Sequence, residues 1–557
     1  MKTAFPPPNS RQPTANSLWT ALVVAIAALL SLPVLVIFRN LFSSTGDIWK
    51  HLAETVLPTY IANSLWLMVG VSLGVGVMGT GTAWLVTMCR FPGSRLLEWL
   101  LLLPLAAPAY ILAYTYTDLL AFYGPVQTLL RSTFGWKSVQ DYWFPNVRSL
   151  WGAVAMLTLV FYPYVYLLVR TAFLSQAVSI LEASRSLGCS PWSSFQKVAL
   201  PLARPAIAAG LSLVLMETLA DYGTVQFFSV DTFTTGIYRT WFGMGERLAA
   251  SQLSAILLLF VFWLVLLERW SRGQARYYQT AARLQQLPTY RLKGVRAIAA
   301  LIACFLPVAL GFLVPAGVLL QMAMADPSQT FNKDFWTVAT HSLTLALLTA
   351  GLAVLIAVIM AYGLRLSPNL GMRLATQTAA MGYAVPGAII AVGTLVPLGA
   401  LDNAVDAWMK STWGISTGLL LSGTISALIF AYLVRFLAVS FNAVDASLTK
   451  IKPSLDDAAR SLGHGATSVL LRIHAPLLWS GLLTAAALVF VDVMKELPAT
   501  LIIRPFNFDT LAVRVYNLAS DERLAEAAGP ALAIVLVGLV PVILLSLSIG
   551  RSRLQRD

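Results

Sequence analysis

Long apolar segments recur along the whole chain, and they limit what it can fold into. A run of about 20 apolar residues crosses a bilayer as a helix, because a helix satisfies its own backbone hydrogen bonds in hydrocarbon. Charged residues make up only 11% of the 557, whereas a soluble domain carries about 25%. We therefore expect an all-α polytopic membrane protein with about 12 transmembrane helices. The expected spans cover residues 20–38, 61–88, 97–120, 150–169, 206–220, 253–267, 297–320, 343–364, 375–398, 417–437, 481–493 and 531–549.

The distribution of lysine and arginine predicts the orientation, because these residues favour the cytoplasmic side of a membrane. With the N-terminus inside, most of the 38 basic residues fall inside, including the dense stretch at 269–296 and the arginines near the C-terminus. We therefore expect cytoplasmic N- and C-termini. The net charge of +13 is explained by this bias together with the anionic membrane lipid, so it does not indicate a nucleic-acid partner.

The two halves of the chain repeat each other. Pro108 recurs as Pro386, and Gly188 recurs as Gly463 at almost the same interval. Each half holds an even number of expected spans, so the two six-helix repeats are parallel and related by an axis along the membrane normal. We predict a first repeat at 1–268, a basic cytoplasmic linker at 269–296 and a second repeat at 297–557.

A polar, helix-forming segment follows the fourth expected span of each half, at 181–201 and at 456–476. Each copy contains a glycine that permits a turn and ends in a proline that opens the next span. The spacing from glycine to proline is the same in both copies, which makes an ordinary loop a poor explanation. We interpret each copy as a short cytoplasmic docking helix through which force enters the protein.

These segments resemble the signature of the permeases of binding-protein-dependent ABC importers. That signature is Glu-Ala-Ala, three residues, Gly, nine residues, Ile, one residue and Leu-Pro. The first copy reads Glu182-Ala183-Ser184, Gly188, Val198, Leu200-Pro201, and the second reads Asp457-Ala458-Ala459, Gly463, Ile473, Ala475-Pro476. The departures are Ser184, Val198, Asp457 and Ala475.

The resemblance implies the type I ABC importer permease fold, in the bacterial inner membrane. It also implies two cytoplasmic ABC ATPase subunits and one periplasmic substrate-binding protein as partners. The residues that it assigns to ATPase coupling are Glu182, Ala183, Gly188, Pro201, Asp457, Ala458, Gly463 and Pro476.

The chain has no Gly-x-x-x-x-Gly-Lys-Ser/Thr loop to hold the phosphates of ATP. We therefore expect a permease subunit that is not an enzyme and has no covalently bound cofactor, with ATP used by the partner ATPases. Three cysteines and four histidines are scattered, and they identify neither a disulfide framework nor a metal site.

Acidic residues fall into register between the repeats. At the interval that separates Gly188 from Gly463, Glu217 corresponds to Asp492 and Asp221 corresponds to Glu496. The two acids of each half are spaced so that they share one helix face. Charged groups in a span usually face an aqueous cavity or a partner, so these four carboxylates, with Tyr222, are candidates for a substrate path that attracts a cation. The alternative is structural: the carboxylates cap helices or pair with Lys495, Arg504, Arg239 or Arg514.

The segments around these carboxylates, 219–225, 232–239, 492–500 and 504–506, look like those of fused ferric-iron permeases. This resemblance implies import of iron(III) from a periplasmic iron-binding protein. Fused thiamine permeases share the architecture, and a polyamine or an oxyanion is a further alternative. A proton-coupled secondary transporter would use the carboxylates differently, but it would not need two ATPase-docking helices.

Overall fold

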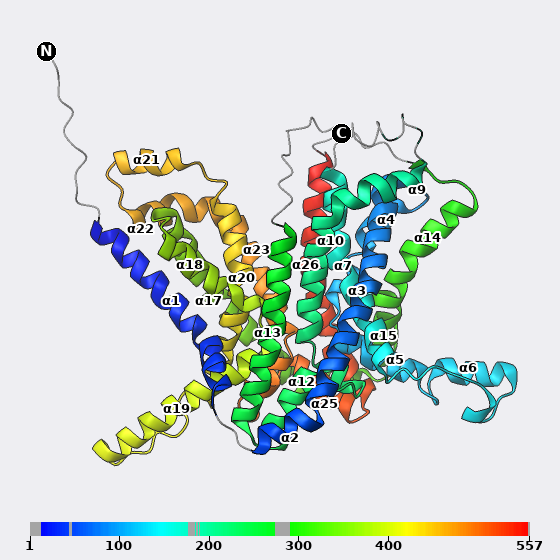
Figure 1. Ribbon diagram of the computed structural model, residues 1–557, viewed down its shortest axis with the longest axis horizontal. Helices are drawn as coiled ribbons and strands as arrows, with labels where there is room; N and C mark the ends of the chain where they lie inside the picture. The colour runs from blue at the N-terminus through cyan, green and yellow to red at the C-terminus, as the bar shows by residue number, and fades with distance from the viewer. Residues whose placement is uncertain are drawn as a thin grey trace. The chain divides into compact units, whose positions relative to one another are not determined.

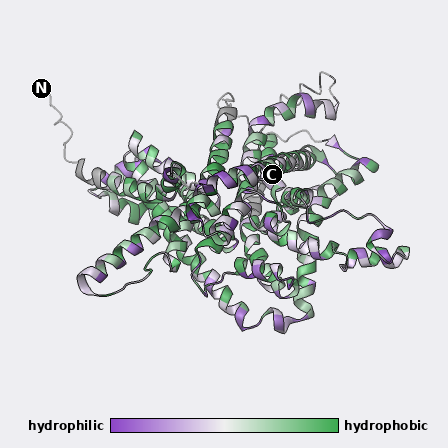
Figure 2. Ribbon diagram, turned by 60° about the horizontal axis from the view of Figure 1, so that its bottom comes forward, coloured by the Kyte–Doolittle hydropathy of each residue, from purple (hydrophilic) through white to green (hydrophobic). Residues whose placement is uncertain are grey.

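The computed structural model describes residues 13–43, 47–175, 184, 186, 188, 190–272 and 290–554. Most of them are helical (Figure 1). Among the described residues, 11 helices are long and apolar enough to span a membrane, or up to 12 if one bent pair counts as a span. This confirms the predicted all-α polytopic class. Apolar residues run along most of the length of these helices (Figure 2).

The predicted bounds 375–398 are wrong, because the chain breaks at Val385 and Pro386 inside them and the long helix begins only at Gly387. With that correction, the long helices overlap the expected spans. They are α1 (Pro13–Leu41), α3 (Leu57–Met88), α7 (Leu150–Ser175), α10 (Leu200–Ala220), α13 (Arg247–Arg272), α14 (Val295–Val308) with η5 (Ala309–Leu313) and α15 (Val314–Ala325), α17 (Lys333–Leu366), α19 (Gly387–Trp413), α20 (Ile425–Leu448), α23 (Ala475–Met494) and α26 (Leu524–Leu554).

Shorter elements connect the long helices. They are α2 (Asp47–Thr55), α4 (Ser94–Leu100), η1 (Leu103–Ala106), α5 (Ala109–Leu120), α6 (Pro125–Phe134), η2 (Val139–Asp141), α9 (Pro191–Ser194), η3 (Phe195–Ala199), α11 (Gly223–Phe227), α12 (Phe233–Tyr238), η4 (Arg239–Gly243), α16 (Pro327–Thr330), α18 (Leu370–Ala379), η6 (Ala380–Ala384), α21 (Pro453–Ser461), α22 (Ala466–Val469), η7 (Leu470–His474), α24 (Pro498–Ile503) and α25 (Leu511–Ser520). Two-residue strands, β1 (Cys89–Arg90) and β2 (Tyr290–Arg291), pair in parallel.

The expected span at 97–120 is bent rather than straight. The segment Ala109–Phe134 turns by 92° from Ser94–Ala106. Ala107 is extended (φ −104°, ψ 125°) because it precedes Pro108, which also lacks the N–H that would continue the helix. The same break recurs before Pro386, where Val385 is extended (φ −85°, ψ 123°) between η6 and α19.

Local irregularities of the helices recur in both sequence repeats. A five-residue π-helical turn, η3, precedes α10, and its counterpart η7 precedes α23 at the corresponding position of the second repeat. The short 3₁₀ helices η1 and η6 both end just before the repeated proline. The boundaries of the two repeats stay predictions, because residues 273–289 of the basic linker lie outside the described residues.

The helices form two compact units. Unit 1 comprises Met1–Arg39, Ser342–Val493 and Ile503–Phe506, and unit 2 comprises Asn40–His341, Met494–Ile502 and Asn507–Asp557. Each unit therefore contains the first span of the other half of the sequence. In unit 1, a Cβ atom on Gly393 of α19 would lie 2.4 Å from the carbonyl oxygen of Pro33 in α1. In unit 2, Tyr116 of α5 donates a hydrogen bond to the carbonyl of Leu310 in η5 (2.6 Å).

Candidate functional site

The second docking segment contains the helix α21. Pro453 occupies its first turn, where the missing N–H costs nothing. The helix ends at Gly463, which has a φ of +83°. The N–H of Gly463 donates to the carbonyl of Arg460 (2.9 Å), and the N–H of His464 donates to that of Ala459 (3.1 Å). This is the Schellman pattern, which needs a left-handed residue at this position.

The motif residues of α21 are available to a partner. Asp457 and Ala458 are exposed, whereas the neighbouring Ala459 is buried. Leu455 and Leu462 are also exposed, Leu462 to 78%. An acid flanked by exposed leucines is a suitable docking surface, because apolar side chains exposed together mark interaction sites.

Asp456 anchors α21 to the spans. Its Oδ1 lies 2.6 Å from Nε2 of His474, and its Oδ2 accepts a hydrogen bond from Nε of Arg365 (2.8 Å). Arg365, in the last turn of α17, also donates to the carbonyls of Leu448 (2.8 Å) and Ile451 (2.9 Å). One arginine thus holds the end of α20, the turn after it and α21 together.

The anchor continues into the span that follows. His474 is fully buried at the end of η7, directly before α23. Tyr362 of α17 donates to the carbonyl of Ala466 (2.8 Å), and its ring centroid lies 5.6 Å from that of His474. These contacts therefore tie α21 to α17, to the end of α20 and to the turn directly before α23.

This anchor was not predicted from the sequence. The only signal was that Asp456 stands directly before the motif, where the first copy has Leu181. At the repeat intervals, Arg365 corresponds to Thr87 and His474 corresponds to Ala199. The first repeat therefore cannot make the same ionic anchor.

The first docking segment is described only in part. Glu182 and Ala183 lie outside the described residues. Ser184 is buried, with its hydroxyl 2.9 Å from that of Ser194 in α9. Gly188 has a φ of +78°, close to that of its counterpart Gly463. Pro201 lies in the first turn of α10, as Pro476 lies in the first turn of α23.

A different ion pair connects the spans of unit 2. Arg170 of α7 pairs with Glu98 of α4, and both side chains are buried. Tyr166 of α7 donates to the backbone carbonyl of Glu98 (2.8 Å). These contacts hold α4 against α7.

Two of the four predicted carboxylates cap short helices. Asp221 follows the last residue of α10 and accepts hydrogen bonds from the Thr224 hydroxyl (3.0 Å) and the Val225 N–H (3.1 Å) of α11. Glu496 accepts one from the N–H of Ala499 (2.8 Å) of α24. The structural alternative that these groups cap helices is therefore confirmed for both, at corresponding positions of the two repeats.

Asp221 is harder to ionise than an exposed aspartate. Burial raises the pKa of this carboxyl to about 6, although hydrogen bonds from Val225 and Thr224 lower it. The carboxylate of Glu217, one turn earlier on α10, raises it further. Asp221 therefore gains or loses its charge within a physiological range of pH.

The other predicted path residues lie in both units. Glu217, at the end of α10 in unit 2, and Asp492, on α23 in unit 1, are each half-buried. Two of the arginines considered as partners pair elsewhere. Arg239 pairs with Asp231 (2.7 Å), and Arg514 lies 3.8 Å from Asp334. The four-carboxylate path stays a prediction.

Tyr222 belongs to a buried cluster of phenols in unit 2. Its hydroxyl lies 3.2 Å from that of Tyr516 on α25, and its ring centroid lies 4.7 Å from that of Tyr238. Tyr114 of α5 is buried nearby and interacts electrostatically with Tyr516 and Asp221. Its hydroxyl has no hydrogen-bond partner among the described residues. The sequence analysis identified only Tyr222, because the other tyrosines lie on distant segments of the chain.

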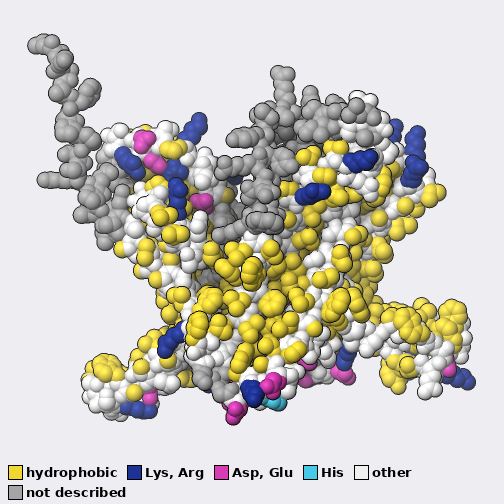
Figure 3. All heavy atoms as spheres, viewed as in Figure 1, with side chains coloured by type: hydrophobic (Ala, Val, Ile, Leu, Met, Phe, Trp, Pro, Cys, Tyr) yellow, Lys and Arg dark blue, Asp and Glu magenta, His cyan; other side chains and the backbone are white. Residues whose placement is uncertain are grey.

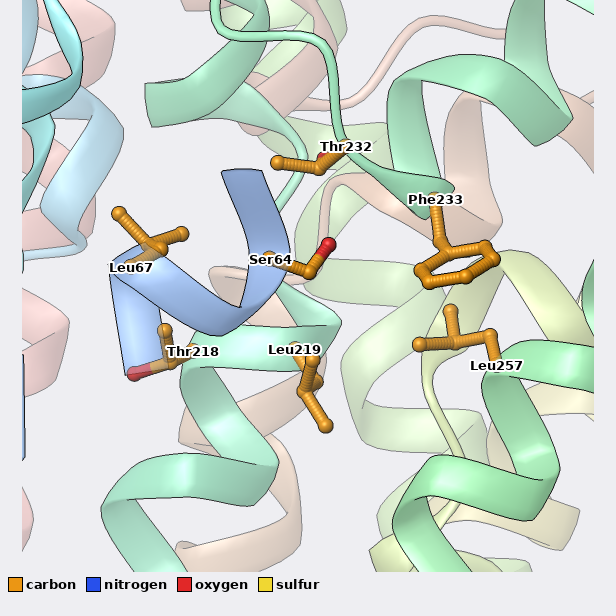
Figure 4. A pocket seen from close by; sticks show the side chains of 7 residues that line it. All are labelled: Ser64, Leu67, Thr218, Leu219, Thr232, Phe233 and Leu257. Carbon is orange, nitrogen blue, oxygen red and sulfur yellow. The ribbon is translucent and has the colours of Figure 1, made fainter. Parts of the chain in front are cut away.

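A small cavity lies beside the end of α10 (Figure 4). It has room for about one water molecule. Its lining comes from α3, α10, α13 and the start of α12, and consists of Ser64, Leu67, Thr218, Leu219, Thr232, Phe233 and Leu257. The cavity is too small to hold a hydrated ion in this conformation.

The chain is similar to known transport permeases. Residues 72–271 match the family described as "Binding-protein-dependent transport system inner membrane component". The Fe(3+)-transport system permease protein FbpB 2 of Haemophilus influenzae is 26% identical over 533 residues, which cover 94% of this chain and 97% of the relative.

Two further relatives differ in the part of the chain that they cover. The ferric transport system permease protein FbpB of Actinobacillus pleuropneumoniae is 22% identical over 96% of this chain and 78% of its own length. The sulfate transport system permease protein CysT of Escherichia coli (strain K12) is 30% identical over 38% of this chain and 74% of its own length. The relatives named for iron therefore match both halves, and the sulfate permease matches a part.

Proposed function

Since this chain belongs to the family of inner membrane components of binding-protein-dependent transport systems, we propose that it is the permease subunit of an ATP-driven importer of ferric iron. Similarity along 94% of the chain to a permease named for Fe(3+) transport carries the proposal of substrate. The exposed motif of α21 supports the ATP-driven mechanism, because it offers an ATPase a surface that is tied to the spans.

The proposed partners are two cytoplasmic ABC ATPases, one for each docking segment, and one periplasmic binding protein. The orientation with both termini in the cytoplasm places α21 on the side where ATP is hydrolysed. The chain has no cofactor of its own in this proposal. Closure of the ATPases moves α21, and the contacts of Asp456 pass that movement to α17 and α23.

The oxygen-rich end of α10 supports a hard cation as the substrate. Carboxylate and phenol oxygens are ligands that suit hard metal ions, and tyrosine binds iron in proteins. Asp221 and Tyr222, with Tyr114 and Tyr516 nearby, supply both kinds of oxygen in one unit. In this proposal the substrate path is lined by Glu217, Asp221, Tyr222, Asp492 and Glu496.

An oxyanion is the second candidate substrate, because the sulfate permease CysT is 30% identical over its matched part. Acidic side chains disfavour this candidate, since they repel an anion. Uptake into proteoliposomes that contain the permease and its ATPases distinguishes the two. We expect ATP-dependent uptake of radioactive iron(III) delivered by a ferric-binding protein, and none of sulfate delivered by a sulfate-binding protein. The reverse result contradicts the proposal.

The substitution Asp221→Asn tests the charge at the path separately from the helix cap. The amide oxygen can still accept from the Val225 N–H, and the amide NH2 can donate to the Thr224 hydroxyl, which then accepts instead of donating. We therefore expect the unfolding temperature of the variant to stay close to that of the wild type. We expect the rate of iron uptake at pH 7.5 to fall about tenfold, as for loss of one favourable interaction of about 1.4 kcal/mol. Glu496→Gln is the matched variant at the repeated position.

The pH dependence gives a second readout of the same variant. Because the pKa of Asp221 is about 6, its charge is present above that pH and is lost below it. The ratio of wild-type to Asp221→Asn uptake should therefore fall towards one as the pH is lowered from 7.5 to 5. A ratio that stays constant over this range would remove Asp221 from the substrate path and leave it a helix cap.

A further inference from the structure

Each half of the chain contains a helical arm, and the helices of the two arms end in similar sequences. We define arm A as residues 122–143 and arm B as residues 401–422. Arm A contains Arg-Ser-Thr-Phe-Gly at 131–135, and arm B contains Lys-Ser-Thr-Trp-Gly at 410–414. Both helices end at the glycine, which has a φ of +74° in arm A and +68° in arm B. Its N–H donates to the carbonyl of Arg131 (2.8 Å) or Lys410 (3.1 Å).

A returning segment covers the polar side of the helix in each arm. In arm B, Asp402 accepts hydrogen bonds from the N–H groups of Leu421 (3.0 Å) and Ser422 (2.8 Å). Asp406 accepts another from the N–H of Thr417 (2.7 Å). In arm A, the Tyr142 hydroxyl of the returning segment donates to the side chain of Gln127 on α6.

Much of the apolar side of each helix is exposed. On α6, Val126, Leu129, Leu130 and Phe134 follow a helical spacing; Leu129 is 67% exposed, and the Phe134 ring stacks on that of Trp136. On α19, Leu401, Val405 and Trp408 do the same, and Trp408 is 55% exposed. Hydrophobic side chains are visible on both arms in Figure 3.

The direction of arm A relates it to the membrane plane. The segment Ala109–Phe134, which ends with α6, turns by 92° from the preceding segment Ser94–Ala106. As a result, α6 projects sideways from the spans of unit 2 (Figure 1). Helices at the membrane interface typically have an apolar face of leucine and aromatic residues, a polar face and a basic residue at the edge. Arg131 and Lys410 provide the basic residue.

We propose that both arms are interfacial anchors whose apolar faces lie in the headgroup region of the outer leaflet of the bilayer. Their occurrence in both repeats supports lipid as the occupant, because lipid surrounds the two halves alike. The anchors would hold the outer ends of α5 and α19 at a fixed depth. This proposal concerns the membrane and does not depend on the identity of the transported substrate.

Spin labels on single cysteines test the proposal in lipid nanodiscs. The native cysteines are first replaced by alanine; Cys89 and Cys304 are buried and unpaired. Labels are then placed at Leu129 and Trp408 on the apolar faces. The matched controls are Thr128 and Asn403, which are exposed on the other side of the same helices.

Collision with oxygen, which dissolves in lipid, is compared with collision with a water-soluble nickel chelate. We expect labels at 129 and 408 to collide at least about threefold more with oxygen, relative to nickel, than the control labels. Equal ratios at test and control positions would overturn the proposal. So would exclusion of nickel at 129 and 408 only after the binding protein is added, because that outcome assigns the faces to protein docking. Labels at Val126 and Leu401 repeat the test if the first variants do not elute as monodisperse protein.

Discussion

Replacing Gly463 with valine should strongly reduce ATP-driven uptake while leaving the protein in the membrane. The residue ends α21 with a φ of +83°, which a β-branched side chain adopts only with strain. The left-handed conformation costs an ordinary residue about 1–2 kcal/mol, equivalent to roughly a tenfold change in the population of the native turn. Without that turn, Asp457 and Ala458 no longer face the ATPase in one orientation. We expect uptake to fall by about tenfold or more.

The control is Gly463→Asn, because asparagine tolerates the left-handed region and is the usual alternative to glycine at this position. No described atom lies within 4 Å of a Cβ added at Gly463, so either side chain fits and only the backbone conformation differs. Uptake and ATP hydrolysis are measured together in proteoliposomes at matched protein content. Valine and asparagine variants of equal activity would show that the turn does not position the docking surface.

Substitution Asp456→Ala should uncouple ATP hydrolysis from uptake. It leaves the fully buried His474 without its acceptor and Arg365 without its counter-ion. Removing one member of a buried ion pair typically costs about 3–5 kcal/mol. Because the Asp456 and Arg365 side chains are about one-sixth exposed, the lower end of that range is the better expectation. We expect uptake per ATP hydrolysed to fall at least about fivefold.

The double variant Asp456→Leu/His474→Ala is the matched control, because it introduces the pair found in the first repeat, Leu181 and Ala199. It removes the buried histidine together with its acceptor, so it should be less damaging to stability than Asp456→Ala, although Arg365 still lacks its counter-ion. We expect the thermal stability of the double variant to lie between those of Asp456→Ala and the wild type, and coupling still to be lost. Full coupling in the double variant would show that Asp456 contributes to stability alone.

The docking segments could be predicted from the sequence because the residues that define each one lie close together in the chain. Equal spacing between Gly188 and Pro201 and between Gly463 and Pro476 predicted equivalent turns, and both glycines do adopt a positive φ. The bend at Pro108 was missed, because its apolar surroundings resemble those of a straight span. The prolines themselves carried that signal.

Contacts between distant segments could not be predicted in the same way. The contact between Asp456 and His474 depends on the course of the chain through α22 and η7, and no periodic pattern in the sequence relates the two residues. The packing of α1 in unit 1 depends on close backbone approach at Gly393, which hydrophobicity does not specify. The caps at Asp221 and Glu496 were foreseen as one of two alternatives, since an acid before a short helix and an acid in a path look alike in sequence.

We expect ATP hydrolysis by the partner ATPases, transmitted through the docking segments, to drive the import of ferric iron. The test measures iron(III) uptake and ATP hydrolysis in the same proteoliposomes, with and without the iron-loaded binding protein. The loaded binding protein should stimulate hydrolysis, and iron should accumulate only while ATP is hydrolysed. Accumulation of iron without the ATPase subunits, driven by an imposed proton gradient, would contradict this coupling.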